Sequence, residues 1–109
     1  MSAPSEPLRV GVLASGAGTN LQALLDTVHG REAQVVAVAS DKPGAVALRR
    51  AESAGIDTAV FPLANHPSRA ARDAAIAAWL LEREVRLVVL AGYMTVSYTH
   101  LTLPTILLV

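Results

Sequence analysis

The sequence predicts an α/β fold, a doubly wound parallel sheet with flanking helices. Short apolar runs alternate along the chain with amphipathic stretches long enough to form helices. The last apolar run, Leu-Val-Val-Leu-Ala at residues 87–91, is apolar on both faces, which is typical of a strand covered by helices on both sides. Strands that alternate with helices in this way build a parallel sheet through right-handed crossovers.

The individual elements follow from periodicity and end signals. Strands are expected at residues 8–14, 34–39, 58–61 and 87–91. The first helix has the inner face Leu21, Leu24, Leu25 and Val28. A second helix covers about residues 45–54. A third helix follows residue 68 and has the inner face Ile76, Trp79 and Leu80. Ser68 is the expected N-cap of the third helix, and Gly55 stands where a left-handed C-terminal cap is needed.

Composition narrows the class of protein. The 109 residues suffice for one domain at most, and 52% hydrophobic residues provide for a packed core. Nine basic and nine acidic residues cancel, so no long-range field draws in nucleic acid or an anionic membrane, and a small-molecule ligand is expected. The absence of cysteine excludes disulfides, thiolate chemistry and a zinc–cysteine cluster, and we expect no metal.

The N-terminal segment shows no targeting signal. Residues 1–7 lack a basic stretch and are expected to be disordered, and no apolar run approaches the roughly 18 to 20 residues that span a bilayer. We therefore expect a soluble cytoplasmic protein.

A glycine-rich loop, Ser-Gly-Ala-Gly-Thr-Asn-Leu at residues 15–21, joins the first strand to the first helix. Unpaired backbone N–H groups and the positive end of the helix dipole converge at such a place and bind anions. Leu21 stands where a dinucleotide fingerprint has its third glycine, and no lysine completes a nucleoside-triphosphate loop. A single phosphate, held by Gly18, Thr19 and Asn20, is the remaining interpretation.

Local pattern leaves alternatives open. Thr19 and Gln22 have the spacing of a capping box, in which the glycines serve only the turn. Asp41 is interpreted as a turn residue rather than the ribose ligand of a dinucleotide site. Neither His29 nor His66 receives a role.

Several motifs, taken together, resemble a known family. They are residues 10–23, Ser40-Asp41-Lys42, Ala54-Gly55-Ile56, Ser68-Arg69 with Asp73, and residues 88–94. In this order and spacing they resemble phosphoribosylglycinamide formyltransferase over about residues 8–94. The resemblance implies the N-terminal part of a Rossmann-like formyltransferase fold. It also implies transfer of a formyl group from 10-formyltetrahydrofolate to the amino group of glycinamide ribonucleotide in purine synthesis.

The resemblance also assigns residues. Gly18, Thr19 and Asn20 would hold the ribonucleotide phosphate, and Arg69 and the backbone around Met94 would face the folate. Formyltransferases that act on initiator tRNA are a weaker match, since their first loop lacks the Gly-Thr-Asn-Leu run and tRNA binding calls for a basic surface. A stand-alone nucleotide-binding module of Rossmann or flavodoxin type, without catalysis, is the alternative.

The C-terminal segment departs from the family pattern at Thr95. The family's catalytic Asn and His, from an Asn-x-His-Pro-Ser-Leu-Leu-Pro segment, and its later Asp are not found, so no catalytic residue is assigned. Residues 96–109 resemble translated sequencing-adapter sequence. We therefore expect residues 95–109 to be non-native and set His100 aside, the alternative being a native strand at 98–103. Strand 87–91 would then form an open edge, which predicts poor solubility or self-association.

Overall fold

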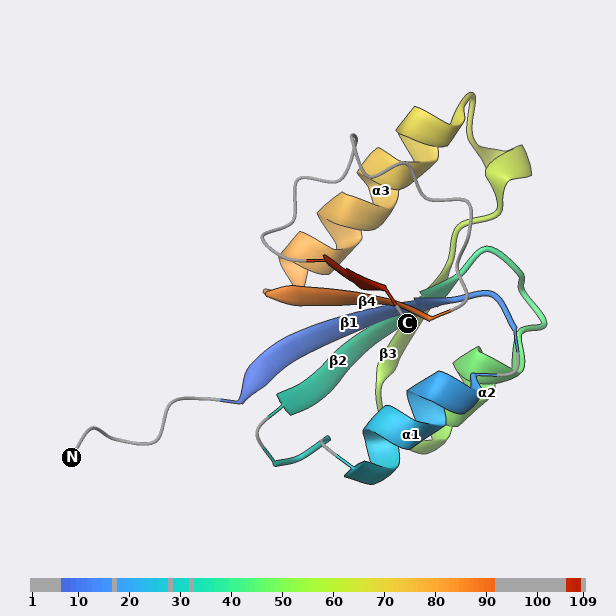
Figure 1. Ribbon diagram of the computed structural model, residues 1–109. Coiled ribbons are helices and arrows are strands. Elements are labelled where there is room, and N and C mark those ends of the chain that lie inside the picture. The colour runs from blue at the N-terminus through green and yellow to red at the C-terminus, as the bar shows by residue number, and fades with distance from the viewer. Residues whose placement is uncertain (1–6, 17, 28, 32, 92–105, 109) are drawn as a thin grey trace.

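The computed structural model of the protein describes residues 7–16, 18–27, 29–31, 33–91 and 106–108. Its centre is a parallel sheet in the order β3-β2-β1-β4-β5 (Figure 1). The strands are β1 (Leu8–Ala14), β2 (Ala33–Ser40), β3 (Asp57–Val60), β4 (Leu87–Ala91) and β5 (Ile106–Leu108). The helices are α1 (Thr19–Thr27), α2 (Val46–Ser53) and α3 (Arg69–Glu82), with a short 3₁₀ turn η1 (Leu63–Asn65) before α3.

The predicted α/β class and the predicted order of elements are confirmed. The ends of β2 and β3 differ from the predicted ranges by one residue, and β1 and β4 coincide with them. Gly55 adopts a left-handed conformation (φ 75°) after α2, and the Ser68 Oγ accepts a hydrogen bond from the Ala71 N–H at 3.1 Å. Local end signals were therefore sufficient to place these helices. Residues 1–6 and Val28, for which disorder and a core position were expected, lie outside the described residues.

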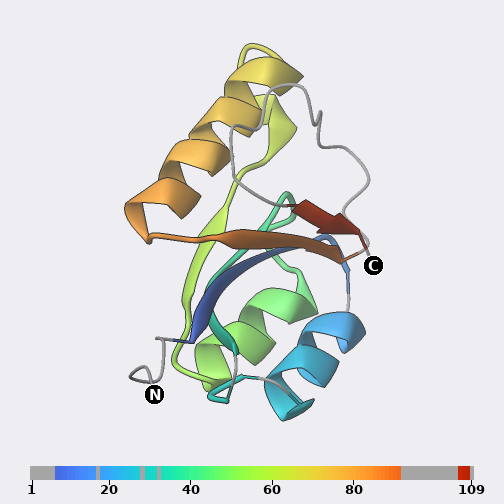
Figure 2. The same cartoon turned by 60° about the vertical axis from the view of Figure 1, so that its left-hand side comes forward.

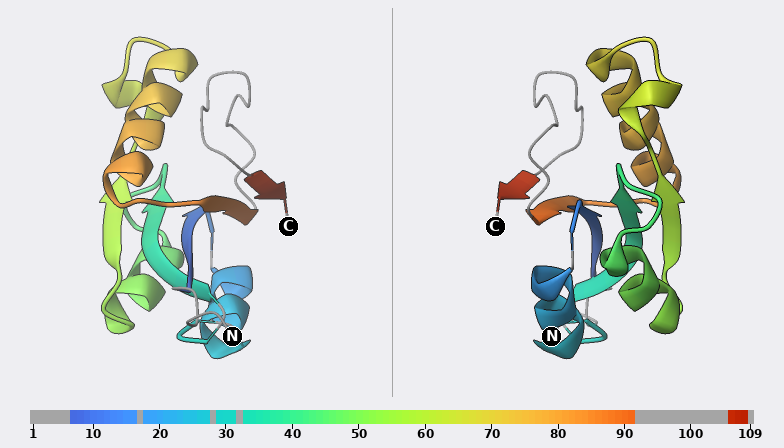
Figure 3. Two further views of the ribbon diagram at one scale, coloured as in Figure 1. Left: turned by 90° about the vertical axis from the view of Figure 1, so that its left-hand side faces the viewer. Right: turned by 90° about the vertical axis from the view of Figure 1, so that its right-hand side faces the viewer.

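One expectation about the sheet is wrong. β4 does not form an open edge, because β5 pairs with it in parallel from Val88 and Ile106 to Leu90 and Leu108. In both views of Figure 3, β5 lies beyond β4, on the side of the sheet opposite β3. The error came from setting residues 95–109 aside, since a tripeptide within that range supplies the strand. Because β4 is paired, it offers no open edge for self-association. The alternative strand at 98–103 lies outside the described residues.

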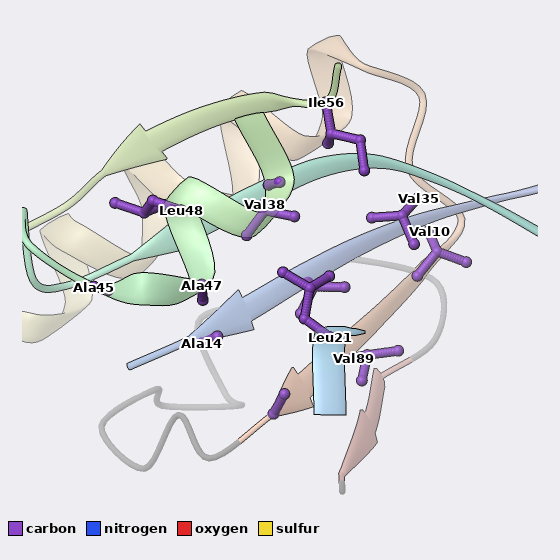
Figure 4. Close-up of a cluster of buried hydrophobic side chains, with 13 residues drawn as sticks. Val10, Ala14, Leu21, Val35, Val38, Ala45, Ala47, Leu48, Ile56 and Val89 are labelled. Carbon is purple, nitrogen blue, oxygen red and sulfur yellow. The ribbon is translucent and has the colours of Figure 1, made fainter. Parts of the chain in front are cut away.

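Helices lie on both faces of the sheet (Figure 2), and the core accordingly consists of two layers, one on each face. Under α1 and α2 lies a cluster that includes Val12, Leu21, Val38, Leu48 and Val89, most of which are labelled in Figure 4. Under α3 lies a second cluster that includes Leu13, Ile76, Leu80, Val88 and Leu90. Neighbouring residues of β1 and β4 thus enter opposite layers, which explains why these central strands are apolar on both faces.

No helix in the described part of the chain combines the length and the apolar character needed to cross a membrane.

Candidate functional site: the loop between β1 and α1

The loop after β1 lies at the point where the chain changes direction within the sheet. α1 leads from β1 to β2 on one side, while β4 pairs with β1 on the other side. Ala14 and Ala91, the last residues of β1 and β4, are register partners, so the two strands end together. Ligands of open α/β sheets bind in the crevice outside the carboxyl ends of the strands at such a switch point. The glycine-rich loop therefore occupies the expected binding position.

The first turn of α1 presents a group of backbone donors. The first intrahelical hydrogen bond runs from the Gln22 N–H to the Gly18 carbonyl at 2.8 Å. The N–H groups of Gly18, Thr19, Asn20 and Leu21 precede this bond and have no acceptor within the helix. Together with the positive end of the helix dipole, these donors are suited to one compact anion. The fold thus places Gly18 directly before α1 and the backbone of Thr19 and Asn20 in its first turn, so the helix begins at the end of the loop as the sequence predicted.

Gly18 has two reasons to be glycine. Its φ is 75°, a conformation that residues with a side chain rarely adopt. A Cβ at this position would lie 2.7 Å from the Cα of Ala47 on α2. Gly16 differs, because a Cβ there would meet no atom within 4 Å. The second glycine therefore sets the turn and permits α2 to approach the loop.

The capping-box interpretation is wrong for Gln22. In a capping box the Gln side chain returns to the backbone N–H at the start of its own helix. Here the Gln22 side chain bonds elsewhere: its Oε1 accepts from Arg50 Nη1 at 3.1 Å, and its Nε2 donates to Asp26 Oδ1 at 2.9 Å. The start of α1 is thereby linked to α2.

The remaining sequence candidates have structural positions of their own. Leu21 is fully buried in the core, where a dinucleotide fingerprint requires glycine. Asp41 lies in the turn after β2, where the Ser40 Oγ accepts a hydrogen bond from the Lys42 N–H at 3.1 Å. The Oδ1 atom of Asp41 is buried and has no hydrogen-bond partner in the described part of the chain. His29 has a role that sequence reasoning missed, because its Nδ1 accepts from the Val35 N–H at 2.9 Å and ties the α1–β2 connection to β2.

The two residues expected to face folate are not brought together by the described structure. Arg69 is the exposed first residue of α3, and Met94 lies outside the described residues. Among the residues the structure describes, no three histidine, aspartate or glutamate side chains gather as metal ligands would.

Sequence reasoning missed a buried ion pair on α3. Arg72 Nη2 lies 3.2 Å from Asp73 Oδ1, and both side chains are almost completely buried. For Asp73 a signal existed, since it shares the helical spacing of Ile76 and Leu80 on the inner face. For Arg72 there was none, because arginine is by default a surface residue.

Comparisons with known proteins agree with this geometry. The phosphoribosylglycinamide formyltransferase of Mycobacterium tuberculosis is 46% identical over 94 residues, which cover 85% of this chain and 43% of that protein. The enzyme of the same name from Haemophilus influenzae is 41% identical over 90 residues, or 81% of this chain and 42% of that protein. The chain thus spans less than half the length of these relatives. It spans only 7% of the trifunctional purine biosynthetic protein adenosine-3 of Drosophila melanogaster, with 45% identity over 92 residues.

Solved structures give the same result. The crystal structure of glycinamide ribonucleotide transformylase 1 from Symbiobacterium toebii superposes with a TM-score of 0.81 at 42% identity, covering 91% of this chain and 50% of that one. Phosphoribosylglycinamide formyltransferase from Brucella melitensis superposes with a TM-score of 0.76 at 41% identity, covering 82% and 47%. The sequence model described as formyl transferase matches residues 8–102, most of the chain and some way beyond Met94. The chain therefore belongs to the formyl transferase family.

Proposed function

We propose that this chain forms the substrate-anchoring part of a phosphoribosylglycinamide formyltransferase. The reaction moves a formyl group from 10-formyltetrahydrofolate to the amino group of glycinamide ribonucleotide. The bond between the formyl carbon and N10 of the folate breaks, a C–N bond to the amino nitrogen forms, and the amine gives up a proton while N10 gains one as tetrahydrofolate is released. The supporting observation is the first turn of α1, where four backbone N–H groups without helical acceptors meet at the carboxyl edge of the sheet. The named relatives at 41 to 46% identity support the choice of substrate.

The phosphate of glycinamide ribonucleotide is the group that fits this turn. The backbone N–H groups of Gly18, Thr19 and Asn20 donate to its oxygens, and the dipole of α1 stabilises its negative charge. No side-chain cation is needed for such a site. In this arrangement the chain binds and orients the ribonucleotide, and we assign no catalytic residue to it.

The folate side of the site is a separate part of the proposal. Arg69 and the backbone around Met94 are proposed to face 10-formyltetrahydrofolate. Support comes from the family motifs that contain them and from β4, which ends at Ala91 beside the last residue of β1, Ala14. There β1 leads into the glycine-rich loop of residues 15–21, called the anion loop below. The cellular site that we propose is the cytoplasm, and the partners are small molecules only.

Calorimetric titration of the 109-residue chain with glycinamide ribonucleotide and, separately, with NAD tests this function. We expect binding of the ribonucleotide and none of NAD, because Leu21 fills the space that a dinucleotide fingerprint keeps open. The double variant Thr19→Ala, Asn20→Ala removes two polar side chains from the first turn and is expected to weaken ribonucleotide binding. A preference for NAD would instead identify a stand-alone nucleotide-binding module and refute the proposal.

A further inference from the structure

We infer that Arg50, on α2, is a positioning residue for the anion loop: it fixes the first turn of α1 through Gln22 without itself contacting the ligand. The inference rests on the proposed function, in which that turn binds a phosphate. It extends the site from one helix to two, since α2 then determines where the donors of α1 lie.

The connection between Arg50 and α1 is a chain of hydrogen bonds through one amide. Arg50 Nη1 donates to Gln22 Oε1 at 3.1 Å, and Gln22 Nε2 donates to Asp26 Oδ1 at 2.9 Å. The amide is thus held between a cation at its oxygen and a carboxylate at its nitrogen, which fixes its orientation. The backbone N–H of the same Gln22 closes the first turn on the Gly18 carbonyl at 2.8 Å. Restraining this side chain therefore restrains the turn that carries the donors.

The aliphatic stem of Arg50 adds a packing contact with the loop. A Cβ on Gly18 would lie 3.3 Å from Arg50 Cδ, so the stem runs beside this glycine. Ala47 lies one turn earlier on the same face of α2 and donates its N–H to the Gly16 carbonyl at 3.3 Å. α2 thereby meets the loop at the Gly16 carbonyl and beside Gly18, and it meets α1 at the Gln22 side chain.

The chain offers a matched control in the neighbouring residue. Arg49 carries the same charge, is exposed, and lines the same groove of about 540 Å³ between α1 and α2. Its side chain forms no hydrogen bond within the described part of the molecule. Arg49→Met therefore removes a cation from the groove but leaves the bond to Gln22 intact.

Affinity for glycinamide ribonucleotide, measured by calorimetry on the 109-residue chain, separates positioning from direct charge attraction. We expect Arg50→Met and Gln22→Met each to weaken binding about tenfold, as loss of one charge-assisted hydrogen bond does. The double variant is expected to lose less than the two single losses multiplied together, because the bond between Arg50 and Gln22 is removed only once. Arg49→Met is expected to bind as the wild type. If Arg50→Met weakens binding while Gln22→Met does not, or if the losses multiply, Arg50 acts by its own charge and the inference is refuted.

Amide hydrogen exchange on the ligand-free chain gives an answer that does not depend on the ligand. We expect the backbone amide at position 22 to exchange about fivefold faster or more in Arg50→Met and in Gln22→Met, and at the wild-type rate in Arg49→Met. A wild-type chain that binds no ribonucleotide refutes the proposed function, yet the exchange rates still decide whether Arg50 positions the turn. Unchanged exchange in both Arg50→Met and Gln22→Met refutes the positioning role whether or not a ligand binds.

Discussion

Gly18 of the anion loop and Ala47 of α2 approach so closely that a methyl group on Gly18 would lie 2.7 Å from the Ala47 Cα. The neighbouring atom belongs to backbone in the first turn of a helix, so it cannot move aside as a flexible side chain does. The anion loop and the second helix are therefore fitted to each other through a glycine, and this fit holds the start of α1 in place.

The two glycines of the loop are expected to respond differently to alanine. Gly18→Ala adds both the overlap with Ala47 and the cost of a side chain at φ 75°, so it should lower the free energy of unfolding by about 2 kcal/mol or more. Gly16→Ala, where the added methyl group meets nothing, should change it by less than about 0.5 kcal/mol. Urea unfolding followed by circular dichroism measures both. Equal losses would show that the contact with Ala47 does not restrict the loop.

The ends of α2 and α3 form the same capping motif with different residues. After α2, Gly55 N–H bonds to the Glu52 carbonyl and Ile56 N–H to the Ala51 carbonyl, both at 3.0 Å. After α3, Glu84 N–H bonds to the Leu81 carbonyl at 2.9 Å, and Val85 N–H to the Leu80 carbonyl at 3.2 Å. Both are Schellman motifs, which place one residue in the left-handed region.

Glu84 occupies that position with φ 57°, whereas Gly55 has φ 75°. Glu84→Gly is expected to raise the free energy of unfolding by about 0.5 to 1 kcal/mol, because glycine adopts this conformation without strain. Gly55→Ala should lower it by about 1 kcal/mol for the same reason. Thermal melts of the two variants are the measurement. A destabilised Glu84→Gly would show that the glutamate side chain contributes more than the strain costs.

Much of the fold could be predicted from the sequence because its signals are local. Periodicity, the Ser68 cap and Gly55 report on residues within one turn of each other, and they located the strands and helices within a residue or two. The backbone donors of α1 were predicted for the same reason. What the sequence did not indicate are contacts across the chain: the approach of Ala47 to Gly18, the bond between Arg50 and Gln22, and the pairing of β5 with β4. These depend on how α2 and the sheet pack, which no local pattern encodes.

The buried pair on α3 makes a prediction of its own. Asp73 accepts from Arg72 Nε and Nη2, and both side chains are shielded from water. Asp73→Asn removes the negative charge beside a buried guanidinium and is expected to lower the free energy of unfolding by about 3 kcal/mol. Replacing both residues together, Arg72→Met with Asp73→Leu, should cost less than the single change, because neither charge of the pair then stays buried without the other.

The control for this pair is Asp57→Asn. Asp57 lies 3.5 Å from Arg83 and is 70% exposed, so its loss should cost less than about 1 kcal/mol. Denaturant unfolding of all three variants decides between the two classes of ion pair. If Asp73→Asn costs no more than Asp57→Asn, the buried pair contributes nothing beyond an ordinary surface interaction.

Arg9 joins the sheet to the far end of α3. Its Nε and Nη2 donate to the carbonyl of Arg83, the C-cap residue of α3, at 3.0 and 2.7 Å, and its own carbonyl accepts from the Arg86 N–H at 2.9 Å. A cation at a helix C-terminus satisfies an unpaired carbonyl and interacts favourably with the negative end of the helix dipole.

Arg9→Met keeps the aliphatic stem but loses both donors, and we expect a loss of about 1.5 to 2 kcal/mol in the free energy of unfolding. Arg86→Met removes an exposed arginine from the same connection while preserving its backbone bond, and it should change stability by less than about 0.5 kcal/mol. Because the bonds of Arg9 close the connection between α3 and β4, amide exchange at Val85 and Arg86 should also rise in Arg9→Met. An Arg9→Met protein that matches Arg86→Met in both stability and exchange would mean that water replaces the guanidinium at the helix end without cost.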